Sequence, residues 1–112
     1  MKKKIADIVI ILIFSLIVSI PLSSNNLDIY RDDGVQHIAR LIGTYQTITE
    51  GEFPSVIMSN FCNGFGYSWN IFYSPFTAYI PLIFSIFTNS FELMLKLFML
   101  LCSFLSGIAM YT

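Results

Sequence analysis

Apolar residues form three long stretches along this chain, and polar segments separate them. The first stretch runs from Ile5 to Leu22 and contains Asp7 and two serines as its polar interruptions. Eighteen helical residues that rise about 1.5 Å each extend about 27 Å, close to the thickness of the hydrocarbon core of a bilayer. The pattern therefore predicts a transmembrane helix within residues 1–22, which Pro21 and the polar residues after it end.

A cleaved signal peptide is the alternative for this first stretch, because a lysine-rich start precedes an apolar core. The apolar run is long for a signal peptide, and the residues Ile20-Pro21-Leu22-Ser23 lack a clean cleavage site. We therefore expect an uncleaved span.

Residues 71–112 contain the other two apolar stretches, Ile71–Thr88 and Phe91–Thr112. Pro75 and Pro81 interrupt the former, but neighbouring spans can satisfy the backbone groups that a proline frees in a membrane helix. The sequence thus predicts an all-α membrane protein with three transmembrane helices. Because three spans do not resemble a complete bundle, we expect a fragment of a larger protein, or a chain whose missing spans come from a membrane partner.

Residues 23–70 form the loop between the first two spans and contain one amphipathic pattern. Apolar residues recur there at i, i+3, i+4 and i+7, namely Ile38, Leu41, Ile42 and Tyr45. This spacing predicts a helix over about residues 32–49, which Gly51 and Pro54 end. We expect its apolar face to lie on the membrane interface or on other spans.

An aromatic loop follows, from Met58 to Asn70. Turn-forming residues alternate there with the rings of Phe61, Phe65, Tyr67 and Trp69. Tyr and Trp favour the headgroup layer of a bilayer, where a ring is partly hydrated. The loop is therefore expected at the boundary between the membrane and water.

Composition agrees with a membrane protein, since 55% of residues are hydrophobic and only 12% are charged. No charge occurs from Ile8 to Leu27 or from Phe53 to Phe91. Lys2, Lys3 and Lys4 precede the first span, whereas the loop after it holds five acids and two arginines. By the positive-inside rule, the N-terminus is cytoplasmic, residues 23–70 are extracytoplasmic, and the turn Thr88–Ser90 between the last two spans is cytoplasmic.

Several partners and chemistries have no support in the sequence. There is no basic patch beyond the N-terminal lysines, so nucleic acid is not an expected partner. Cys62 and Cys102 form no metal-binding spacing, and His37 is the single histidine, so no metal site is expected. The sequence identifies no cofactor.

Asp33, His37, Arg40 and Thr44 are the residues with chemical potential. Their spacing places them within about 60° of one another around a helix. Asp33 is a candidate general base, and Arg40 can bind a phosphate through its planar guanidinium, with His37 beside both. The alternative is a solvated row of charges that stabilises the helix by a few tenths of a kcal/mol.

Four short motifs occur in order: Asp33-x-x-x-His37-x-x-Arg40, Gly51-x-x-Pro54, Asn63-Gly64-Phe65-Gly66-Tyr67 and Ile71-Phe72-Tyr73-Ser74-Pro75-Phe76. Together they resemble the N-terminal part of large bacterial multi-span proteins described as 6-pyruvoyl-tetrahydropterin synthase-related, which are similar to C-type glycosyltransferases. Phe65 stands where that family has Tyr, and Ser74 replaces a proline. The family proteins have many more spans than this chain.

The resemblance implies a catalytic acidic residue in the first extracytoplasmic loop and a sugar donor linked to polyprenyl phosphate. Carried over, Asp33 is the catalytic residue. His37 and Arg40 match the motif, but the resemblance assigns them no role, and we expect them to bind substrate because of their side-chain chemistry. The first functional hypothesis is therefore the N-terminal portion of a glycosyltransferase-like enzyme at the outer face of the cell membrane, inactive as an isolated chain. The second is a small non-catalytic three-span protein that binds a larger membrane partner.

Overall fold

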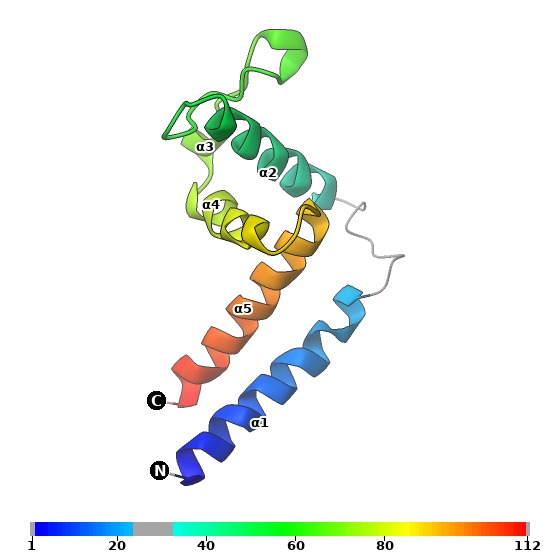
Figure 1. The fold of residues 1–112 in the computed structure, drawn as a ribbon, viewed down its shortest axis with the longest axis vertical. Helices are drawn as coiled ribbons and strands as arrows, with labels where there is room; N and C mark the ends of the chain where they lie inside the picture. The colour runs from blue at the N-terminus through cyan, green and yellow to red at the C-terminus, as the bar shows by residue number, and fades with distance from the viewer. Residues whose placement is uncertain (1, 24–32, 112) are drawn as a thin grey trace. The chain divides into compact units, whose positions relative to one another are not determined.

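The computed structural model describes residues 2–23 and 33–111 (Figure 1). Their helices, in chain order, are α1 (Lys2–Ser19), η1 (Ile20–Ser23), α2 (Gly34–Thr49), η3 (Cys62–Gly64), α3 (Trp69–Phe72), α4 (Phe76–Ile83), η4 (Phe84–Ile86) and α5 (Phe91–Tyr111), where η marks a 3-10 helix. The chain divides into two compact units, one of residues 1–27 with 95–112 and one of residues 28–94. The all-helical prediction is confirmed for the described residues, in which one isolated β-bridge also occurs.

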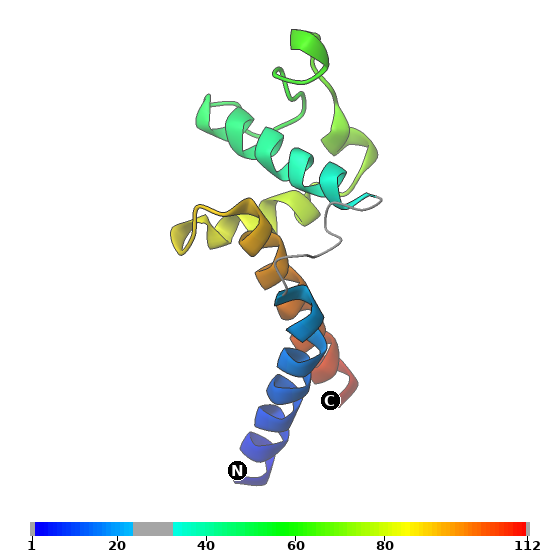
Figure 2. The same ribbon diagram turned by 90° about the vertical axis from the view of Figure 1, so that its right-hand side faces the viewer.

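The first unit is an antiparallel pair of helices, formed by α1 and most of α5. The Tyr111 hydroxyl of α5 donates a hydrogen bond of 2.6 Å to Asp7 Oδ2 of α1. One turn further along α1, Ile11 lies against Gly107 of α5. Residue numbers thus rise along α1 while they fall along α5, and the two helices lie side by side in both views (Figure 1 and Figure 2). A glycine at the crossing allows close approach, as is typical of helix pairs in membranes.

The serine hydroxyls of this pair bond to their own helices. Ser15, Ser19 and Ser103 each donate to the carbonyl oxygen four residues earlier, at 2.8–3.0 Å. Such bonds satisfy a hydroxyl without water, which is what a lipid environment requires. Among the described residues, α5 is the one helix that is both long and apolar enough to cross a membrane.

The structure agrees with the predicted three spans only in part. The last one, over residues 91–112, is confirmed as a helix of spanning length, and the first coincides with α1 and η1. The predicted helix over residues 71–88 is wrong, because three short helices replace it, and the longest has eight residues. Pro75 stands at the N-cap of α4, where a proline begins a helix rather than continuing one.

The second unit packs α2 on α4. Its buried side chains include Leu41 from α2, Ala78 from α4 and Met58 from the segment between them. The predicted helix over residues 32–49 is confirmed as Gly34–Thr49 with Asp33 at its N-cap, while Asp32 lies outside the described residues.

The predicted faces of α2 are wrong in part: Leu41 is buried and Asp33 and His37 are exposed as expected, but Arg40 and Thr44 are buried. The buried residues of α2 are Arg40, Leu41, Gly43, Thr44 and Thr47, so the second half of the polar row faces inward, whereas Tyr45 of the predicted apolar face is exposed. Two features make this possible. Arg40 and Thr44 find hydrogen-bond partners in the segment that covers them, and a glycine on the same face leaves room for the Phe61 ring.

The loop predicted over Met58–Asn70 is confirmed as far as Ser68, apart from η3, but its last two residues, Trp69 and Asn70, begin α3. Met58 and Tyr67 exchange two backbone hydrogen bonds of 3.0 and 3.2 Å, which close the loop at its base. Gly64 and Gly66 adopt φ angles of +90° and +80°, which disfavour residues with a Cβ atom. The glycines of the third motif therefore shape this turn.

Candidate functional site

The N-terminal end of α2 presents an acid and an imidazole to solvent. Asp33 occupies the N-cap, and its side chain forms no capping hydrogen bond, so the carboxylate is not used to begin the helix. Its carbonyl oxygen accepts a hydrogen bond of 3.0 Å from the backbone N–H of His37. Both side chains are exposed. Asp33 and His37 are thus accessible one turn apart, as the sequence predicted.

Arg40 lies one turn further along α2 but points into the protein. Only 3% of its surface is exposed. Its Nε donates to Asn70 Oδ1 at 3.1 Å, its Nη2 donates to the Ser74 carbonyl, and its guanidinium carbon lies 5.7 Å from the centre of the Tyr73 ring. The guanidinium therefore attaches α2 to the segment that leads into α4.

Burial lowers the pKa of Arg40 below its ordinary value, and the interaction with Tyr73 acts in the opposite direction. An arginine keeps its charge under these conditions, because its unperturbed pKa is far above neutral. The site thus contains a fixed positive charge with partners inside the protein. Phosphate binding by Arg40 would require it to release Asn70 and Ser74, so the structure favours a positioning role over the predicted contact with substrate.

Asn70 is the residue that sequence reasoning missed. Its amide nitrogen donates to Thr44 Oγ1 at 3.2 Å and to the Ser55 carbonyl at 2.9 Å, while its oxygen accepts from Arg40. The amide therefore links α2, the start of the loop and α3. A single polar residue between Trp69 and Ile71 was the available signal, but its partners are 15 to 30 residues away in sequence.

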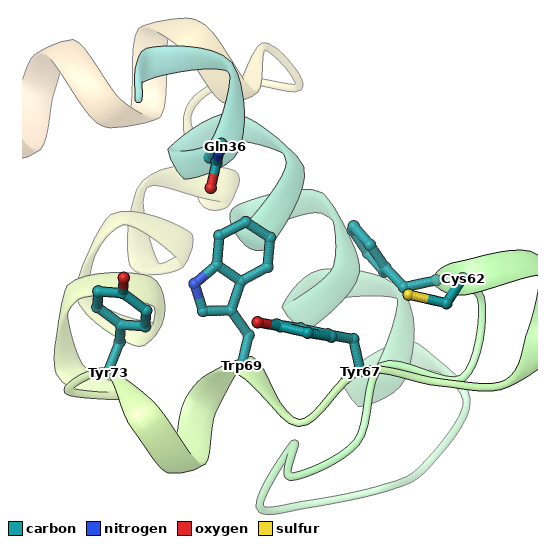
Figure 3. Close-up of a pocket in the computed structure, with 6 residues that line it drawn as sticks. Gln36, Cys62, Tyr67, Trp69 and Tyr73 are labelled. Atoms are coloured by element: carbon teal, nitrogen blue, oxygen red, sulfur yellow. The ribbon is translucent and has the colours of Figure 1, made fainter. Parts of the chain in front are cut away.

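An aromatic cavity of about 250 Å³ lies beside this polar network, between α2, the loop and α3 (Figure 3). Its lining residues are Gln36, Phe61, Cys62, Tyr67, Trp69 and Tyr73. Trp69 stands nearly perpendicular to two neighbouring rings, with centroids 6.2 Å from Phe61 and 5.5 Å from Tyr67. Such edge-to-face pairs fix the rings and leave aromatic surface at the cavity wall.

The cavity and the exposed acid share the first two turns of α2. Gln36 lines the cavity and lies between Asp33 and His37 in sequence. Tyr73 lines the cavity too and is the ring over which Arg40 stands, so the aromatic wall and the buried charge are coupled. The arrangement combines a mostly apolar hollow, one amide, an accessible carboxylate and an accessible imidazole.

No group of three or more histidine, cysteine or acidic residues comes together within residues 2–23 and 33–111. Cys62 and Cys102 are both free and exposed. The chemistry available at the site is therefore that of Asp33, His37 and the cavity.

No family model and no solved structure matches this chain. A protein of Lactococcus lactis subsp. cremoris (strain MG1363), described as an uncharacterized protein, is 30% identical to it over 103 residues. The similarity covers 92% of this chain but 17% of the relative. The chain thus spans less than a fifth of the length of the relative that it matches.

Proposed function

We propose that this chain is the N-terminal portion of a glycosyltransferase-like membrane enzyme, which transfers a sugar from a polyprenyl-phosphate donor at the outer membrane face. The observation that carries the proposal is the exposed carboxylate of Asp33 at the N-cap of α2, one turn before Gln36, which lines an aromatic cavity. The order of the four motifs supports it as well.

The cavity suits one sugar ring. Ligand pockets for drug-sized molecules measure about 300–1,000 Å³, and this cavity is slightly smaller at about 250 Å³. Aromatic faces can cover the apolar side of a sugar, and Gln36 supplies an amide for its hydroxyl groups. The lipid tail of the donor would remain in the membrane.

Asp33 would act as general base in the transfer. The acceptor hydroxyl oxygen forms a bond to the anomeric carbon, the bond from that carbon to the phosphate oxygen breaks, and the hydroxyl proton passes to Asp33. The leaving polyprenyl phosphate retains the electron pair and the negative charge. His37 is the accessible residue that can donate to this phosphate, while Arg40 holds the cavity wall through Tyr73.

The membrane arrangement belongs to the same proposal. α5 meets the requirements of a span, and α1 pairs with it where Gly107 lies against Ile11, while the serine hydroxyls of both helices bond to their own backbone. Three lysines at the start of α1 favour a cytoplasmic N-terminus in the cell membrane. The relative is far longer than this chain. We therefore assign the activity to a longer protein that contains this chain, and we regard the chain as contributing part of the catalytic site of that protein.

Trp69 fluorescence tests donor binding directly, because Trp69 lines the cavity and is the single tryptophan. The chain in lipid nanodiscs would be titrated with a polyprenyl-phosphate-linked sugar and, separately, with the same polyprenyl phosphate without sugar. We expect a saturable change in emission with the sugar-bearing lipid alone, and weaker binding after Tyr67→Ala. No change with either lipid would contradict the proposal.

Asp33→Asn in the longer protein tests the chemistry. Removal of a general base lowers the rate of sugar transfer by about 10²–10⁴-fold. The matched control is Glu52→Gln, which also removes one exposed carboxylate, at the opposite end of α2. Equal activity of the two variants would exclude Asp33 as the base and favour the alternative, a non-catalytic protein that binds a larger membrane partner.

A further inference from the structure

We infer that the segment from α4 to η4, residues 76–86, rests on the surface of the bilayer and does not cross it. Two spans, α1 and α5, then carry the chain across, and the chain between them does not cross the membrane. The inference rests on the membrane placement proposed above, but not on the sugar-transfer chemistry.

The length of the segment excludes a crossing. Eight α-helical residues extend about 12 Å and three 3-10 residues about 6 Å, against a hydrocarbon core of about 30 Å. Residues 71–88 are therefore apolar for a reason other than crossing the membrane, contrary to the prediction from their composition.

The antiparallel pairing of α1 and α5 independently indicates that residues 71–88 do not cross the membrane. Contacts between Asp7 and Tyr111, and between Ile11 and Gly107, place the start of α1 beside the end of α5. Two antiparallel spans enter and leave on the same side, so the chain between them crosses the membrane an even number of times. One additional crossing by residues 71–88 would require α1 and α5 to be parallel.

Some side chains in and next to this segment are buried in the protein, and others are exposed. Ala78 and Pro81 are buried in the second unit. Phe76, Ile83, Ile86 and Phe87 are instead between 60% and 80% exposed. Water is an unfavourable neighbour for four such side chains, whereas an apolar face with a packed opposite face is typical of helices that lie in the membrane interface.

Chain connectivity identifies lipid as the occupant. Phe87 is four residues before Phe91, the first residue of the membrane-span candidate α5. The backbone N–H of Leu93 donates to Ser90 Oγ at the start of that helix, and the N–H of Ser90 donates to Thr88 Oγ1. This polar turn marks the level where α5 enters the bilayer, so the apolar side chains directly before it reach the same leaflet.

Cysteine accessibility in intact cells distinguishes the two topologies. In a background with Cys62→Ser and Cys102→Ser, single variants Asn63→Cys, Asn89→Cys and Met110→Cys would be treated with a membrane-impermeant maleimide before and after lysis. The inference places Asn63 and Asn89 on one side and Met110 on the other. We expect Asn63→Cys and Asn89→Cys to react in intact cells, and Met110→Cys to react only after lysis.

The opposite grouping would overturn the inference: Asn63→Cys and Met110→Cys reacting together, with Asn89→Cys protected, is the pattern of three spans. Reaction of Met110→Cys alone would keep the two-span topology but invert the proposed orientation. Lipid contact has its own test, in which Phe87→Trp is introduced together with Trp69→Phe. Bromine-labelled lipids should quench this tryptophan more strongly than aqueous iodide does, and the reverse would refute contact with the bilayer.

Discussion

Replacement of Asn70 by alanine should destabilise the second unit more than any other single loss of a polar side chain in it. The side chain accepts a hydrogen bond from Arg40 and donates to Thr44 and Ser55. Alanine removes all three bonds at once. It also leaves the Nε of a buried guanidinium and a loop carbonyl without their partner.

The magnitude follows from the kind of bonds that are lost. A hydrogen bond between neutral groups contributes about 0.5–1.5 kcal/mol, and one to a charged group about 1.5–3 kcal/mol. Because Asn70 itself is only half-buried, water can reach the space that its side chain vacates and compensates for some of this loss. We expect Asn70→Ala to lower the free energy of unfolding by about 2–4 kcal/mol, which shifts a urea midpoint by about 1–2 M for a typical small protein.

The assay is urea unfolding in detergent micelles, followed by the fluorescence of Trp69, the neighbour of Asn70. Asn60→Ala is the matched control, because Asn60 also donates to two side chains but is exposed, with bonds of 3.3 and 3.5 Å. The control should change stability by less than about 0.5 kcal/mol. If the two variants unfold at the same urea concentration, the polar network does not stabilise this unit.

Three glycine substitutions test the packing and the turns. Gly107→Ile should weaken the α1–α5 pair, because an added Cβ would lie 2.6 Å from a methyl carbon of Ile11, and crosslinking yield between cysteines at positions 7 and 111 would report the loss. Gly66→Ala should lower the thermal midpoint more than Gly64→Ala: both have positive φ, but only the former brings a Cβ within 2.8 Å of a side chain. Equal midpoints would contradict this difference.

The sequence predicted α2 and its end well, because both depend on local chemistry. Apolar residues at helical spacing favour the helix, and Gly51 adopts a φ of +95°, which few residues other than glycine tolerate. The last apolar stretch became α5 for a similar reason, since its length and composition alone are those of a spanning helix.

The side of α2 that packs was not predictable by the same means. Periodicity locates an apolar face on the assumption that polar side chains remain in water. Arg40 and Thr44 break this assumption, because partners distant in sequence satisfy them inside the protein. The second span was predicted wrongly for a comparable reason. Membrane helices do tolerate prolines, but Pro75 begins α4 instead of lying within a span.

The buried arginine explains why motifs far apart in sequence belong together. Arg40 closes the first motif, and its partners Tyr73 and Ser74 belong to the last. The same helix carries His37 one turn before Arg40 and Asp33 two turns before it, so a fixed Arg40 also fixes where the exposed acid lies relative to the aromatic cavity. Arg40→Met, which keeps the length of the side chain but removes its donors, should therefore alter the fluorescence of Trp69 even though Arg40 does not line the cavity.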